Sequence, residues 1–156
     1  GDAFLLSMMM IIFYGSAAFS NFLMIRLMPL LRPGRVFLLM QLSRMVILGV
    51  MWIQPSFWLM VLATVGWGLN MGVTMTLSRS IVQESATVEF RARILSVYSL
   101  GLLGSAPIGA LMLGLIIERF GTLNALIPAM IISVVLFVYG FFFTGVYNYR
   151  SPTVPN

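Results

Sequence analysis

The chain has 156 residues, of which 60% are hydrophobic and 8% are charged, and nine arginines against four acidic residues give a net charge of +5. Its mean hydropathy of +1.03 is far above what a soluble globular domain requires. Histidine and cysteine do not occur, which excludes disulfides, metal sites with those ligands and hydrolytic triads that need histidine. We therefore expect no enzyme activity, no cofactor, no metal and no nucleic-acid partner. The arginines are expected to meet the headgroups of a lipid bilayer.

Five apolar stretches follow one another along the chain. Each is long enough to cross a hydrocarbon core about 30 Å thick as a helix of ~20 residues. The stretches predict an all-α membrane protein with five transmembrane helices joined by short connections, and residues 151–156, with two prolines, are expected to form a disordered cytoplasmic tail. The stretches cover residues 4–25, 36–53, 57–77, 94–117 and 123–146.

The arginines collect in every second gap between these stretches, and the remaining gaps hold only Arg119. Because basic residues accumulate in cytoplasmic loops, this alternation predicts an outside N-terminus and a cytoplasmic C-terminus. We expect an integral protein of a bacterial inner (plasma) membrane. An odd number of helices and a start at Gly1 further indicate a portion of a longer protein. The basic gaps contain Arg26, Arg32 and Arg35, then Arg79, Arg91 and Arg93, and finally Arg150.

The third stretch carries the most site-like pattern. Trp67, Asn70, Thr74 and Ser78 recur at steps of three and four, so they share one face of a helix. An amide such as Asn70 is costly in hydrocarbon unless it is paired or borders water. This face is therefore predicted to line a substrate cavity, and an interhelical hydrogen bond is the alternative.

The first stretch has a sparser polar stripe. Ser7, Tyr14 and Asn21 follow at sevenfold spacing, which keeps them on one helical face. Cavity lining by Tyr14 and Asn21 and packing against another helix fit this pattern equally well.

Small residues at a spacing of four predict close helix contacts. Gly68 and Gly72 form such a face on the third stretch, beside the polar one. Gly101, Ser105 and Gly109 form a similar ladder on the fourth stretch. Both are predicted to pack against other helices.

Arg44 is the only charged residue deep inside a predicted helix. An intramembrane arginine is a candidate functional residue, and the alternative is that its side chain snorkels to the headgroups. All four acidic residues lie near predicted helix ends. If Arg44 stays buried, we therefore expect its carboxylate partner outside this chain.

Two arginine-containing segments carry recognisable motifs. Arg32-Pro33-Gly34-Arg35 resembles the R-x-G-R core of a loop motif of the major facilitator superfamily, although Leu31 stands where that family has an acidic residue. Glu89-Phe90-Arg91-Ala92-Arg93-Ile94 is similar to the element that precedes the eleventh helix of its drug and siderophore exporters, with Ala92 in place of glycine.

This resemblance implies helices eight to twelve of a twelve-helix secondary transporter that works by alternating access. It implies export of an amphipathic organic solute, with the missing N-terminal helices as partners. The first, third and fourth helices would border the central cavity, and the second, with Arg44, would lie outside it. The arginines of the two motifs would hold the cytoplasmic loops. The alternatives are a non-transporting scaffold that assembles through its Gly-x-x-x-Gly faces and, less favoured, a membrane-embedded enzyme of lipid metabolism.

Overall fold

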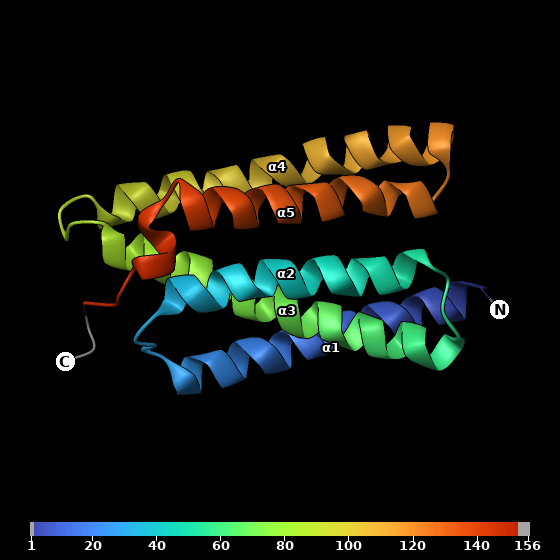
Figure 1. The fold of residues 1–156 in the computed structure, drawn as a ribbon, viewed down its shortest axis with the longest axis horizontal. Coiled ribbons are helices and arrows are strands. Elements are labelled where there is room, and N and C mark those ends of the chain that lie inside the picture. The colour runs from blue at the N-terminus through green and yellow to red at the C-terminus, as the bar shows by residue number, and fades with distance from the viewer. Residues whose placement is uncertain (1, 153–156) are drawn as a thin grey trace.

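The computed structural model describes residues 2–152, and this part of the chain is an all-α bundle (Figure 1). Five helices are long and apolar enough to cross a membrane, as the sequence predicts, and they fit an integral membrane protein. The elements are α1 (Asp2–Leu27), α2 (Pro33–Trp52), α3 (Phe57–Ser85), α4 (Arg91–Phe120), the short 3₁₀ helix η1 (Leu123–Ala125), α5 (Leu126–Phe142) and the 3₁₀ helix η2 (Gly145–Asn148).

Two helix ends differ from the hydropathy pattern by four residues or more. Helix α3 continues past residue 77 to Ser85, because a polar surface does not end a helix, and Ser80 Oγ donates to Glu84 Oε1 one turn later at 2.9 Å. The loop that follows is correspondingly short. The last helix ends at Phe142 although the apolar run continues to residue 146. There Thr144 accepts a hydrogen bond from Val146 N and begins η2.

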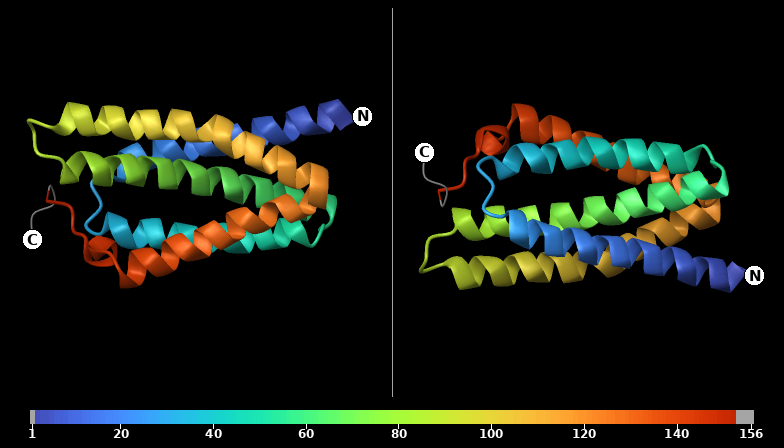
Figure 2. Two further views of the ribbon diagram at one scale, coloured as in Figure 1. Left: turned by 90° about the horizontal axis from the view of Figure 1, so that it is seen from above. Right: turned by 90° about the horizontal axis from the view of Figure 1, so that it is seen from below.

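Helix α3 lies at the centre of the bundle. Views from above and below place it between α1 and α2 (Figure 2). Helix α5 packs on α2, and the buried side chains of Leu48, Met51 and Ala63 form the core between α2 and α3. Helix α4 ends at Gly121, which has a φ of +84°. Helices α4 and α5 are joined at this turn and diverge with distance from it (Figure 2). None of the α4 residues is buried.

The interface between α1 and α3 depends on the glycines at positions 68 and 72. A Cβ at Gly72 would lie 2.5 Å from Ala17 O and 2.8 Å from Ser20 Cβ. One at Gly68 would meet α1 a turn earlier. The backbones are thus close enough for Ser20 Oγ to donate to Leu69 O at 2.8 Å. The structure thereby places α1 against the face that the glycine spacing marks for close contact.

The second small-residue ladder has no such neighbour. No heavy atom of the described chain lies within 4 Å of a Cβ built at Gly101 or Gly109, apart from their own helix surroundings. Ser105 Oγ donates within its own helix, to the backbone oxygen of Leu102 at 3.0 Å. The expectation that these residues pack against a helix is therefore not met within residues 2–152, because α4 leans away from the rest of the bundle.

The C-terminal segment folds back on the first connection of the chain. Ser151 is only 4% exposed, and its N–H donates to Leu31 O at 3.3 Å. Ser151 thus makes a tertiary contact at the start of the segment for which the sequence predicts a disordered tail. Residues 153–156 of that tail lie outside the described residues.

Candidate functional site

Asn70 lies at the centre of a polar cluster between α2 and α3. Its side chain is 3% exposed, and its Nδ2 donates to Met40 O and to Ser43 Oγ, each at 2.7 Å. Its Oδ1 accepts from Arg44 Nε at 3.1 Å. The structure thus gives Asn70 the interhelical hydrogen bonds that the sequence left as the alternative to cavity lining.

Thr74 extends the cluster by one turn of α3. Its Oγ1 donates to Asn70 O at 2.6 Å and accepts from Arg44 Nη2 at 3.3 Å. Arg44 therefore reaches across to α3 and does not snorkel to a helix end. We call Ser43, Arg44, Asn70 and Thr74 the Arg44 cluster. The helix with Arg44 thus contributes to the site, whereas the resemblance implies that it lies outside the central cavity.

An open groove of about 420 Å³ runs beside this cluster and is lined by residues of all five long helices. We call it the mid-helix groove. Arg44, Trp67, Thr74 and Ser78 line it, and the Trp67 ring packs on Phe13 with centroids 5.0 Å apart. Three members of the predicted polar stripe thus border one groove, while Asn70 lies beneath it and holds Arg44.

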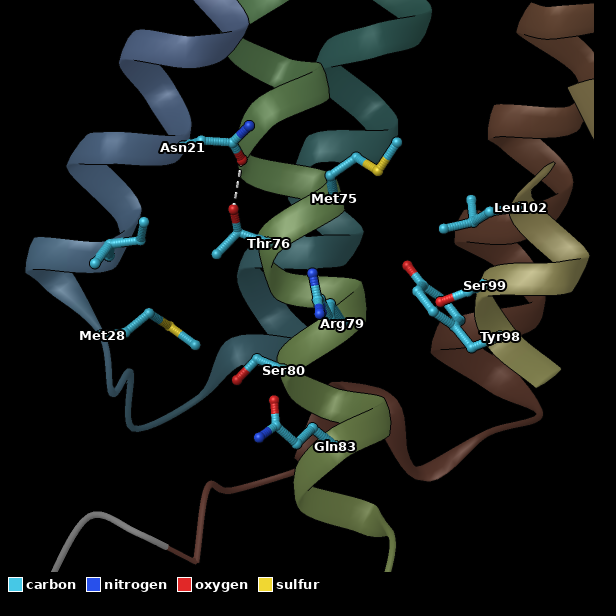
Figure 3. Close-up of a pocket in the computed structure, with 11 residues that line it drawn as sticks. Asn21, Met28, Met75, Thr76, Arg79, Ser80, Gln83, Tyr98, Ser99 and Leu102 are labelled. Atoms are coloured by element: carbon cyan, nitrogen blue, oxygen red, sulfur yellow. Dashed lines mark hydrogen bonds between the residues drawn. The ribbon is translucent and has the colours of Figure 1, made fainter. Parts of the chain in front are cut away.

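A second groove of about 590 Å³ lies between α1, α3 and α4 (Figure 3). We call it the terminal groove, because it lies where α1 and α3 end and α4 begins. Asn21 lines it and accepts a hydrogen bond from Thr76 Oγ1 at 2.6 Å. The structure therefore separates Asn21 from Trp67 and Thr74. Other polar lining residues are Arg79, Ser80, Gln83 and Ser99.

Tyr14 belongs to neither groove. Its side chain is 58% exposed, and its ring meets Phe13 edge-on at 5.2 Å. Its neighbour Phe13, and not Tyr14, lines the mid-helix groove beside Trp67. The sevenfold spacing could not reveal this, because it fixes a shared helical face but not the neighbour which that face meets.

The two grooves adjoin at Tyr98, a residue that the sequence pattern did not single out. Tyr98 lines both grooves, and its hydroxyl donates to Ser78 Oγ at 2.9 Å. This hydrogen bond ties α4 to α3. The available signal was chemical: a tyrosine hydroxyl inside an apolar helix requires a polar partner.

The R-x-G-R segment begins α2 and packs against η2. The guanidinium carbon of Arg35 lies 4.5 Å from the centroid of the Tyr147 ring. Gly34 is buried, and a Cβ there would collide with the carbonyl oxygen of Val146. Arg32 occupies the N-cap position of α2 without a capping side-chain hydrogen bond. The glycine of this segment is therefore required for close backbone contact.

The second arginine segment begins α4. Arg93 lies over the Phe90 ring at 6.0 Å. Arg91 Nε is buried without a hydrogen-bond partner among the described residues. In this part of the chain the two arginine segments are held by different neighbours, one by η2 and the other by its own loop.

No family model, curated protein or solved structure matches the chain. Within residues 2–152, no group of three or more acidic, histidine or cysteine side chains is placed to hold a metal ion. The chemical groups at the site are a guanidinium, an amide, hydroxyls and aromatic rings.

Proposed function

We propose that the chain is part of a secondary active transporter that exports amphipathic organic solutes by alternating access. The observation that carries this proposal is the mid-helix groove. It combines an indole, hydroxyls and one guanidinium with apolar walls, halfway along helices long enough to cross a membrane. Binding sites for organic solutes are commonly apolar cavities with a few polar groups, in a volume of about 300–1,000 Å³.

The position of the Arg44 cluster supports a transport site over a purely structural contact. Arg44 follows the first residue of α2 by eleven positions (44 − 33), or ~16 Å of helix. Charged side chains at this depth are rare and commonly mark a substrate or ion pathway. The terminal groove adjoins the mid-helix groove and extends the hollow surface toward the arginine-rich helix ends.

The resemblance of the arginine segments extends the proposal to a family. On that basis the chain corresponds to helices eight to twelve of a major facilitator superfamily transporter in a bacterial inner membrane, with its C-terminus in the cytoplasm. Arg32, Gly34 and Arg35 lie at one end of the bundle together with Arg91 and Arg93, as that family's cytoplasmic motifs would require. The remaining helices of the transporter would complete the cavity.

An efflux assay with two matched tryptophan variants tests the proposal. Cells that express the intact protein are loaded with a fluorescent amphipathic dye, and its loss is followed after energisation. Trp67→Ala removes the indole that lines the mid-helix groove, and we expect the initial efflux rate to fall at least about tenfold, as for a lost binding contact. Trp58→Ala removes an indole that is 75% exposed near the start of α3 and should leave efflux unchanged. Equal rates for both variants at equal membrane abundance would exclude this site.

A scaffold that assembles with other membrane proteins remains the second candidate. The observation in its favour is the open ladder of Gly101, Ser105 and Gly109 on α4, which no other element of the described chain covers. Bulky substitutions on this ladder would then abolish co-purification of partner helices, and Trp67→Ala would have no effect.

A further inference from the structure

Arg44 is held in place by neutral groups. Its Nε and Nη2 donate to Asn70 Oδ1 and Thr74 Oγ1. A guanidinium has five N–H donors, and the remaining ones have no hydrogen-bond partner among the described residues. Arg44 therefore keeps both its charge and part of its donor capacity.

The two acceptors are themselves oriented toward Arg44. The amide nitrogen of Asn70 is used by Met40 O and Ser43 Oγ, so its oxygen is left to face the guanidinium. The Thr74 hydroxyl gives its proton to Asn70 O at 2.6 Å, so it presents a lone pair to Arg44. The side chain is thus preorganised, which lowers the entropy lost when it binds a further group.

The described carboxylates are too far away to neutralise Arg44. Glu84 follows Thr74 by ten positions on α3, or ~15 Å, and its oxygens accept from Ser80 and Tyr149. Glu89 lies in the loop before α4, and Glu118 lies in the last turn of α4. An uncompensated charge in an apolar setting is strongly unfavourable, so the site favours an anion from outside these residues.

We propose that the mid-helix groove binds an amphipathic organic anion, whose carboxylate or sulfonate pairs with Arg44 and whose apolar body contacts Trp67. This deepens the proposed transport function and rests on it. The groove supplies the aromatic surface of Trp67 and Phe13 next to the guanidinium. Arginine suits such groups because its planar fork matches the geometry of a carboxylate. A neutral solute of the same shape would leave the charge of Arg44 unpaired.

Two probes that share a ring system test the inference by binding alone. The intact protein is placed in phosphatidylcholine nanodiscs, and dissociation constants are measured for 1-anilinonaphthalene-8-sulfonate and for its uncharged relative N-phenyl-1-naphthylamine. Arg44→Gln should weaken binding of the sulfonate about 10–100-fold, the worth of a charged hydrogen bond. The uncharged probe should change less than about threefold. The control is Arg79→Gln, which removes an exposed arginine that lines the terminal groove instead and should leave both affinities unchanged.

A second pair of variants keeps Arg44 in place. Thr74→Asp puts a carboxylate beside the guanidinium, where Nη2 already contacts position 74 at 3.3 Å, and should abolish selective sulfonate binding. Thr74→Asn also loses the hydroxyl and has nearly the same shape as the aspartate but no charge, so selective sulfonate binding should be clearly weaker in Thr74→Asp than in Thr74→Asn. This pair carries the test if Arg44→Gln does not fold.

The possible outcomes distinguish a failure of the anion-binding inference from a failure of the proposed transport function. Equal affinity losses for both probes, or none, overturn the inference. So does an Arg44→Gln protein that unfolds more readily while it keeps sulfonate affinity, because Arg44 would then pair with a carboxylate of another segment. If Trp67→Ala abolishes efflux but Arg44→Gln spares sulfonate binding, the transport function stands and the anion does not. If sulfonate binding needs Arg44 but no groove variant alters efflux, the anion site stands and the transport function does not.

Discussion

Replacing Gly72 by alanine tests the packing of α1 on α3. The added Cβ would lie 2.5 Å from Ala17 O and 2.8 Å from Ser20 Cβ, whereas ordinary contacts begin at 3.4 Å. One of these atoms is backbone and cannot rotate away. Helix α1 therefore has to retreat by about 1 Å, as overpacked helices do when side chains cannot adjust.

That retreat has a predictable magnitude. It stretches the hydrogen bonds from Ser20 to Leu69 and from Thr76 to Asn21, now 2.8 and 2.6 Å, and interhelical hydrogen bonds in membranes are worth ~0.6 kcal/mol each. Together with lost packing, overpacking costs about 1–3 kcal/mol. Alanine regains up to ~1 kcal/mol of helix propensity.

Gly66→Ala is the matched control on the same helix. Its Cβ would meet only the Ile47 side chain, with Cδ1 at 3.5 Å and Cγ1 at 3.7 Å, both ordinary contacts, so it gains the same propensity without the collision. We expect Gly72→Ala to melt below Gly66→Ala by about 2–12 °C, because the overpacking costs about 1–3 kcal/mol and 1 kcal/mol corresponds to ~2–4 °C for a chain of this size. Thermal unfolding in a mild detergent, followed by circular dichroism, measures the difference. Equal melting temperatures would refute the close α1–α3 approach.

Two further predictions concern the contact between α2 and η2 and the orientation of the chain in the membrane. Gly34→Ala should displace η2, because its Cβ collides with the Val146 carbonyl, and should speed proteolysis after α5; Gly145→Ala, with nothing within 4 Å of its Cβ, should not. Because the chain has no cysteine, Ser56→Cys and Thr87→Cys report the orientation directly: an impermeant maleimide should label only Ser56→Cys in intact cells. Labelling of Thr87→Cys alone would reverse the predicted topology.

The sequence was sufficient for features that depend on local chemistry. Apolar length fixes the number of helices, and glycine spacing marks the face of α3 that another helix approaches closely, because only a residue without a Cβ permits that distance. The hydropathy pattern did not predict the C-terminal end of α3. Hydropathy falls after Leu77, but the helix extends to Ser85, since hydropathy reports the depth of a segment in the membrane and not its backbone conformation.

The partners of Arg44 could not be read from the sequence so easily, because a carboxylate was expected. Instead an amide and a hydroxyl accept its hydrogen bonds. A geometric clue did exist: the hairpin turns at Pro55, so Met40 and Asn70, each fifteen positions away (55 − 40 and 70 − 55), lie opposite one another. By contrast, the contacts of Tyr98 and Ser151 join distant segments, and no local pattern encodes them.

The return of Ser151 to Leu31 has a consequence for biogenesis. Almost the whole chain separates the two residues, and synthesis proceeds from the N-terminus. The first connection therefore leaves the ribosome long before the segment that closes over it. Until η2 (Gly145–Asn148) has left the ribosome, the start of α2 lacks its cover of η2. The arginines there are then open to lipid phosphates, which would help anchor the hairpin of α1 and α2 in its orientation while the later helices insert.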